Sequence, residues 1–223
     1  MKKRLLNFLV LISLAIPGLV SAQMTDLIFS EYSEGSSFNK YLELYNGTGQ
    51  VVDLTGYSIW KITNDGYWFE RDFPLSGFLA DDKTYLIVHE DADPALLALR
   101  DTIGPPGIDF ALFNGNEAYA LVKFVGGDTI FVDVIGVESG TETPANWDVA
   151  GVSGAGAEHT WIRKPNVCSP TADWATSART DADNSQWIIY DQDYWEDAAK
   201  HTTTCAAPMT ETTSELFFSE YGE

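Results

Sequence analysis

The sequence contains few basic residues. It has 13 lysines and arginines against 33 aspartates and glutamates, which gives a formal net charge of −20. A surface of this sign repels phosphate backbones, which proteins usually contact through lysine and arginine. The composition therefore predicts no direct binding of nucleic acid by this segment, and it favours a protein that stays soluble outside the cell.

Cysteine is also scarce. Cys168 and Cys205 are the only two, and neither has the close cysteine or histidine companions of a zinc site. In an exported chain such a pair indicates a disulfide, with two free thiols as the alternative. The bridge would close a loop of about 38 residues and add about 4 kcal/mol of stability in the chain-entropy model.

Long hydrophobic runs are missing after residue 22. Before that point, Lys2, Lys3 and Arg4 precede the apolar run LLNFLVLISLAIPGLV, and the small residues VSA precede Gln23. This is the layout of a secretory signal peptide, and the run is short for a transmembrane anchor. We expect residues 1–22 to be removed from a protein that is secreted or held at the cell surface. The leader carries three basic residues and no acid, so its removal changes the net charge from −20 to −23.

Recognisable catalytic motifs are absent from the sequence. It has no nucleophile elbow, no zinc-binding His-Glu-x-x-His helix and no phosphate-binding glycine loop. His89, His159 and His201 lie far apart, and we interpret each as an ordinary surface or edge residue. The many carboxylates single out no pair across a cleft, as a glycosidase would need. We predict no catalytic residue and no cofactor in this segment.

Two acidic runs raise the alternative of a calcium site. The runs are DADNS at residues 181–185 and DQDYWED at residues 191–197. Calcium binds six to eight oxygen atoms from flexible loops, but neither run has the glycine and glutamate spacing of an EF-hand. Solvated acidic loops are the simpler interpretation, so we predict no metal site.

Short runs rich in valine, isoleucine and aromatic residues dominate the chain. They read LIFSEY, KYLELYN, YSIWKI, TYLIVHE, YALVKFV, TIFVDVIGV and TWIRK, and turn sequences such as NGTG, NDG and GGD separate them. In KYLELYN, leucines alternate with tyrosine and glutamate, as expected for a strand with two different faces. The two runs that flank GGD should form a hairpin. This pattern predicts an all-β sandwich.

Three stretches depart from the strand pattern. Residues 91–103, DADPALLALRDTI, have an aspartate cap and an early proline, which predict a short helix. Residues 136–158 are rich in glycine, serine and threonine and predict a long surface loop. Residues 168–205 read as a C-terminal extension held by the disulfide, and residues 206–214 have the composition of a linker.

Aromatic residues gather around the turn NDGYWF. Trp60 and Trp68 are the largest of them, with Tyr57 and Tyr67 beside them. If their rings were exposed they would stack on sugar rings, as in a carbohydrate-binding module. If they were buried they would pack the core and the hairpin, and this second interpretation is favoured.

The segment LIFSEYSEGSSFNKYLELYN resembles the opening of the lamin tail domain in its bacterial secreted form. The matching positions are Ser30–Tyr32, Glu34–Ser37, Asn39–Lys40 and Glu43–Asn46, and weaker likeness continues to Val167. The resemblance implies an immunoglobulin-like sandwich over residues 23–167. We expect the acids Glu31, Glu34 and Glu43 to hold Lys40 and loop amides rather than to act as acid and base.

The last eight residues, LFFSEYGE, repeat six of the eight positions in LIFSEYSE at residues 27–34. We interpret residues 215–223 as the start of a second copy of the domain, in the N-terminal part of a longer modular chain. The resemblance implies a non-catalytic binding or structural module with an undefined protein or glycan ligand. The alternatives are an accessory domain of an extracellular nuclease or other hydrolase, and a carbohydrate-binding module.

Overall fold

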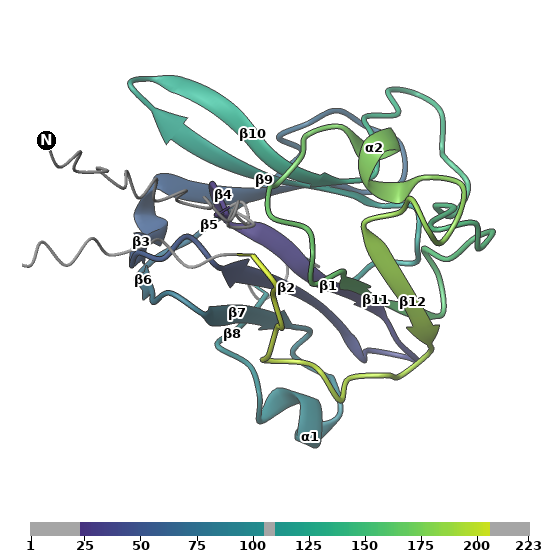
Figure 1. Ribbon diagram of the computed structural model, residues 1–223. Coiled ribbons are helices and arrows are strands. Elements are labelled where there is room, and N and C mark those ends of the chain that lie inside the picture. Colours follow the sequence, from purple (N-terminus) through teal and green to yellow (C-terminus); the bar gives the residue numbers. More distant parts are fainter. Residues whose placement is uncertain (1–22, 105–109, 206–223) are drawn as a thin grey trace, which may run out of the picture.

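The computed structural model describes residues 23–104 and 110–205, and strands dominate it (Figure 1). The strands are β1 (Ile28–Glu34), β2 (Lys40–Asn46), β3 (Val52–Asp53), β4 (Tyr57–Ile62), β5 (Arg71–Pro74), β6 (Phe78–Leu79), β7 (Lys83–Val88), β8 (Thr102–Ile103), β9 (Ala118–Val125), β10 (Asp128–Ile135), β11 (His159–Arg163) and β12 (Trp187–Asp191). The helical segments are the 3-10 turn η1 (Leu54–Gly56), α1 (Pro94–Leu97) and α2 (Trp174–Ala178). The predicted leader, linker and repeated strand lie outside the described residues.

Two main sheets form a sandwich. One has the order β12-β11-β1-β2-β7-β8 and the other the order β10-β9-β4-β5, while β3 and β6 pair separately. Apolar side chains from both main sheets, such as Leu42, Leu44, Ile59 and Leu121, belong to one buried cluster between them. The predicted immunoglobulin-like β-sandwich is confirmed.

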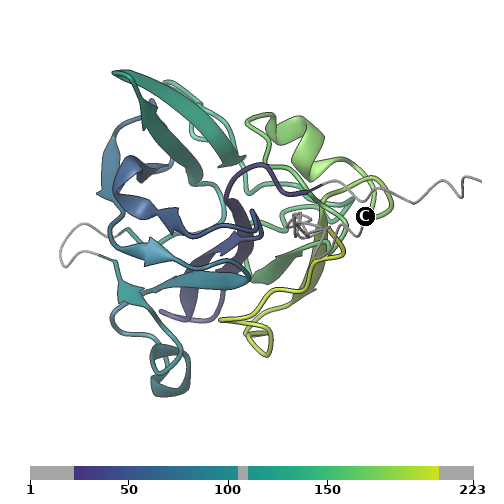
Figure 2. The same cartoon turned by 60° about the vertical axis from the view of Figure 1, so that its left-hand side comes forward.

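The hairpin predicted around Gly-Gly-Asp joins β9 to β10. Gly126 and Gly127 form its turn with φ angles of 62° and 95°, a backbone conformation that glycine adopts without strain. Antiparallel pairing starts directly at Val125 and Asp128. Figures 1 and 2 both show this hairpin extending beyond the body of the sandwich.

The predicted helix is present but short. Asp93 caps α1 by accepting a hydrogen bond from the backbone nitrogen of Ala95 at 2.8 Å, and Pro94 occupies the first turn. The helix ends at Leu97, and the chain then returns to pair β8 in parallel with β7. Across both described ranges, no helix is long and apolar enough to cross a bilayer.

The predicted surface loop at residues 136–158 is partly built into the core. Val149 and Ala155 are completely buried, and the indole nitrogen of Trp147 donates to the carbonyl oxygen of Glu117 at 2.8 Å. A Cβ atom at Gly156 would lie 1.9 Å from the carbonyl oxygen of Gly115, so only glycine fits there. Small residues in this loop therefore permit close packing as well as turns.

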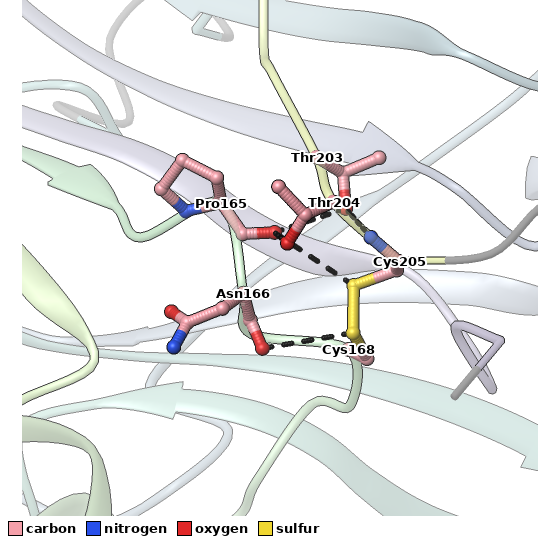
Figure 3. Close-up of a disulfide and its surroundings, with 6 residues drawn as sticks. All are labelled: Pro165, Asn166, Cys168, Thr203, Thr204 and Cys205. Carbon is pink, nitrogen blue, oxygen red and sulfur yellow. Dashed lines mark hydrogen bonds between the residues drawn. A yellow bond between two sulfur atoms is a disulfide. The ribbon is translucent and has the colours of Figure 1, made fainter. Parts of the chain in front are cut away.

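The C-terminal extension adds both a strand and core residues to the sandwich. β12 pairs antiparallel with β11, and Trp187 and Trp174 belong to the main apolar cluster. The expected disulfide joins Cys168 to Cys205. Beside it, the carbonyl oxygen of Pro165 accepts the backbone N–H of Thr204 at 2.8 Å (Figure 3).

The two ends of the described chain lie together. Met24, near its start, is buried in a small apolar cluster with Ile28 and Tyr45. Cys205, its last described residue, packs against the same cluster.

Candidate functional sites

Two glutamates of the opening segment lie side by side on the outer face of the six-stranded sheet. Glu31 of β1 stands opposite Glu43 of β2 in the strand register, and both are completely buried. The hydroxyl of Ser30, at a β-bulge, donates to Oε1 of Glu43 at 2.7 Å. The hydroxyl of Tyr41 donates to Oε2 of Glu31 at 2.7 Å. The face that a simple sandwich would expose to water is therefore enclosed here.

Residues 192–205, which we call the C-terminal strap, enclose this face. Trp195 and Ala198 of the strap pack with Tyr41 and with apolar residues of β7. The backbone nitrogen of Ala199 donates to Oε2 of Glu43 at 2.7 Å. In Figure 1 the strap, coloured yellow, passes in front of β2 and β7. Both faces of these central strands are consequently buried.

The enclosed glutamates have raised pKa values. Burial, partly offset by the hydrogen bond from Tyr41, raises the pKa of Glu31 to about 8. Burial and the neighbouring charge of Glu31 also raise the pKa of Glu43 well above its usual range. Oε1 of Glu31 is buried and has no hydrogen-bond partner among the described residues. Two carboxylates this close and this dry do not both ionise, so the pair holds a proton at neutral pH.

The three acids of the opening segment were predicted to hold Lys40 and loop amides, and two of them do so. Glu34 forms an ion pair with Lys40, and its Oε2 accepts the backbone N–H of Glu158 at 2.6 Å. Glu43 likewise binds a loop amide, that of Ala199. Glu31 instead accepts the hydroxyl of Tyr41, and within residues 23–104 and 110–205 it forms no hydrogen bond with Lys40 or a loop amide.

The loop between β1 and β2 binds the beginning of the strap. Asp193 accepts hydrogen bonds from the backbone nitrogen of Ser36 at 2.9 Å and from its hydroxyl at 2.6 Å. It also accepts the side-chain amide of Asn39 at 3.2 Å. These bonds lower the pKa of Asp193 against the opposing effect of partial burial. Ser36 of the Glu-Gly-Ser-Ser stretch and Asn39 of the Asn-Lys pair thus hold the strap in place.

Each acidic run considered for calcium has one carboxylate that is hydrogen-bonded within the protein. Asp193 holds the loop described above, and Asp181 accepts hydrogen bonds from the backbone and side chain of Asn184, each at 2.9 Å. Among the described residues, no three histidine, cysteine, aspartate or glutamate side chains gather in a way that could hold a metal ion.

A buried ion pair, which the sequence did not single out, links the two sheets. Asp133 of β10 and Arg163 of β11 are completely buried and bind each other. The Asp133 carboxylate also accepts the backbone nitrogens of Phe29 at 2.9 Å and Thr171 at 3.1 Å. Arg163 donates to the carbonyl oxygen of Phe29 at 2.9 Å. The signal available in the sequence was one aspartate within the apolar run TIFVDVIGV and one arginine within TWIRK.

The two tryptophans considered for ligand stacking are partly buried. Trp60 and Trp68 each pack edge-on against Phe131, with ring centroids 5.6 Å apart in both pairs. Trp60 also contacts Phe69, whose side chain is exposed. These residues lie on the outer face of the four-stranded sheet, so the structure brings them together as one aromatic group.

The three histidines are not alike. His89 stacks on Phe38, and His159 lies at the start of β11. His201 of the strap packs against Tyr45, and both of its ring nitrogens are buried without a hydrogen-bond partner among the described residues. Burial lowers the pKa of His201 to about 4. His89 is also buried, so the interpretation as a surface residue describes neither His89 nor His201.

Comparison with known proteins agrees with this geometry. The lamin tail domain profile matches residues 21–139, more than half of the chain. The chain belongs to the lamin tail domain family. Among curated proteins, none matches the chain at a significant level.

The lamin tail domain is an immunoglobulin-like domain without catalytic activity of its own. The matched region ends beyond β10, so β11 and β12 follow it in the sequence. In space, however, β11 pairs directly with β1. The sheet of this lamin tail domain therefore includes strands from outside the matched region.

Proposed function

We propose that the chain is a non-catalytic binding or structural module of a secreted, modular bacterial protein. The observation that carries this proposal is the use of its buried acids. Glu43 and Asp133 are completely buried, and each accepts several hydrogen bonds that hold segments of the domain together. The partly buried Asp193 holds the strap in the same way. Carboxylates enclosed in this way serve the architecture, while an acid–base catalyst needs a position within reach of substrate.

Secretion is supported by two features. The first 22 residues have the layout of a signal peptide, and the Cys168–Cys205 disulfide belongs to a type of bond that persists in oxidising compartments. The modular character rests on the repeat of the β1 sequence at residues 216–223. We infer from this repeat that the domain is the N-terminal part of a longer chain.

An accessory role beside a nuclease or another hydrolase is a narrower form of the same proposal. In that case the activity would belong to another domain, since a net charge of −20 disfavours contact between this segment and phosphate backbones. The carbohydrate-binding alternative rests on Trp60 and Trp68, whose rings are only partly exposed.

The non-catalytic assignment is tested with purified protein from Gln23 onward. We expect no cleavage of DNA or RNA in the presence of magnesium or calcium. The single variants Glu31→Gln and Glu43→Gln serve as matched controls, because each removes one enclosed acid while keeping its shape. Turnover by a clean preparation that a single such substitution abolishes would refute the proposal.

A further inference from the structure

A cleft of about 380 Å³ opens on the outer side of the four-stranded sheet. It lies where three segments meet: the β4–β5 connection, β10 with the residues after it, and the stretch before α2. Its lining residues are Trp68, Phe131, Val134, Gly136, Val137, Glu138 and Ala172. Pockets for small molecules in proteins have volumes of about 300–1,000 Å³, so the cleft lies near the lower end of that range.

Two aromatic rings form walls of the cleft. Trp68 and Phe131 are 5.6 Å apart between ring centroids, with 62° between their planes. Trp60 also packs against Phe131, at an interplanar angle of 85°. The face of an aromatic ring carries partial negative charge and attracts cations, most strongly for tryptophan.

A carboxylate completes the cleft. Oε1 of Glu138 accepts the backbone N–H of Trp68 at 2.9 Å, which ties the carboxylate to the backbone of the residue whose indole also lines the cleft. No hydrogen bond within residues 23–104 and 110–205 engages its other oxygen, and the residue is exposed. No lysine or arginine is among the lining residues. The cleft therefore offers negative charge and aromatic faces without an internal cation to occupy them.

A neutral sugar matches this arrangement less well. The two rings that line the cleft, Trp68 and Phe131, stand at 62° to each other, so they form no flat platform on which a sugar ring could stack. The strongly acidic chain adds an attraction that acts on cations and leaves neutral sugars unaffected.

We propose that this cleft receives a lysine or arginine side chain of a partner protein, held between Trp68, Phe131 and Glu138. This inference rests on the proposed binding module and names the chemistry of its partner. Failure of the inference would leave the non-catalytic assignment standing, because the nucleic-acid cleavage test does not involve the cleft.

The test follows the indole N–H resonance of Trp68 by NMR in the protein from Gln23 onward. The probes are Nα-acetyl-arginine amide, Nα-acetyl-lysine amide and Nα-acetyl-norleucine amide. Norleucine has the length of the lysine stem without its charge. We expect saturable shifts of the Trp68 signal with at least one cationic probe and about tenfold weaker binding of the neutral probe.

Two variants and one control localise the binding. Glu138→Gln keeps an oxygen that can accept the Trp68 N–H but removes the charge, and it should weaken cation binding about two- to fivefold. Ala172→Phe should fill the cleft from its rim and abolish binding. Glu196→Gln removes an exposed charge from the strap, on the other sheet, and should leave the affinity unchanged.

Three results would overturn the proposal. Equal binding of the norleucine probe would show that charge is irrelevant. Saturable shifts of Trp68 with cellohexaose, but with neither cationic probe, would assign the cleft to glycans. Equal losses of affinity in Glu138→Gln and Glu196→Gln would show that cation binding depends on the net charge of the chain and not on the cleft.

Discussion

At the scale of single residues, the most unusual group is Glu31. It lies opposite a second buried carboxylate, that of Glu43, and under the strap. Enclosure in this position favours the neutral form, and the protonation of Glu31 is therefore linked to whether the domain is folded.

This linkage predicts a loss of stability at alkaline pH. The pKa of Glu31 is raised from 4.5 to about 8 in the folded protein. Its contribution is fully present below the unfolded pKa and is lost as the pH rises through about 8. We expect the unfolding free energy to fall by about 4 kcal/mol between pH 5 and pH 9, or roughly 8–16 °C in Tm. Thermal melts across this range measure the effect.

Glu31→Gln is the matching variant. It keeps the size of the side chain and removes the ionisation, so the alkaline limb of its stability profile should flatten. A profile identical to that of the unaltered protein would contradict the role assigned to Glu31.

His201 predicts a loss of stability at acidic pH. Its pKa is lowered from 6.5 to about 4 by burial. The unfolded chain therefore binds this proton more readily, and stability is lost as the pH falls from 6.5 towards 4. His201→Phe, which retains a ring against Tyr45, should be less sensitive to acid in thermal melts over the same interval. If the variant lost stability at acidic pH as strongly as the unaltered protein, groups other than His201 would be responsible for that loss.

Truncating one member of the buried Asp133–Arg163 ion pair should strongly lower the stability of the domain. Arg163→Ala leaves the Asp133 charge buried and without its cation, which should cost about 3–5 kcal/mol of unfolding free energy in denaturant titrations. Arg71→Ala is the control, because Arg71 is exposed beside Glu70 and should cost less than about 1 kcal/mol. Similar losses in both variants would mean that burial of the pair contributes little.

At the scale of elements, the disulfide fixes the end of the strap. Replacing both Cys168 and Cys205 with alanine should lower the stability by about 4 kcal/mol in the chain-entropy model and loosen residues 192–205. Trypsin should then cut faster at Lys200, which is exposed within the strap. The rate of cleavage at Arg71 in β5, which is remote in sequence from the strap, is the internal control. Equal acceleration at both positions would indicate general unfolding instead.

The sequence predicts local elements well because their causes are local. Alternation in KYLELYN, the glycines at 126–127 and the Asp93–Pro94 cap each act within a few residues, and the structure contains the strand, the hairpin and the helix start. The opening motif also identified the sandwich.

Contacts across long sequence distances could not be predicted in the same way. Alternation shows that Glu43 faces away from Leu42 and Leu44, but it cannot show that Ala199, 156 residues later, covers that face. Likewise Asp133 and Arg163 meet only because β10 and β11 lie in opposing sheets. The aromatic cleft needs Ala172 from the extension, which no local pattern associates with Trp68.

At the scale of the whole molecule, the domain starts and ends in one place. Met24 and Cys205 belong to the same small group of packed residues. Fluorophores attached at positions 23 and 203 should therefore show high energy transfer in the folded protein and a marked decrease in denaturant. Low transfer before denaturation would contradict this arrangement.

In the modular chain proposed above, the closeness of the two ends determines how far each domain extends the chain. A domain that the chain enters and leaves at the same corner projects to the side of the chain and adds little to its length. A domain with its ends at opposite poles would lengthen the chain by its full diameter. Added copies would then multiply the clefts on display with little increase in reach. Tension along the chain would then enter the sandwich through β1 and, by way of the disulfide, through the residues after β11, its partner strand, so the β1–β11 pairing would bear the load.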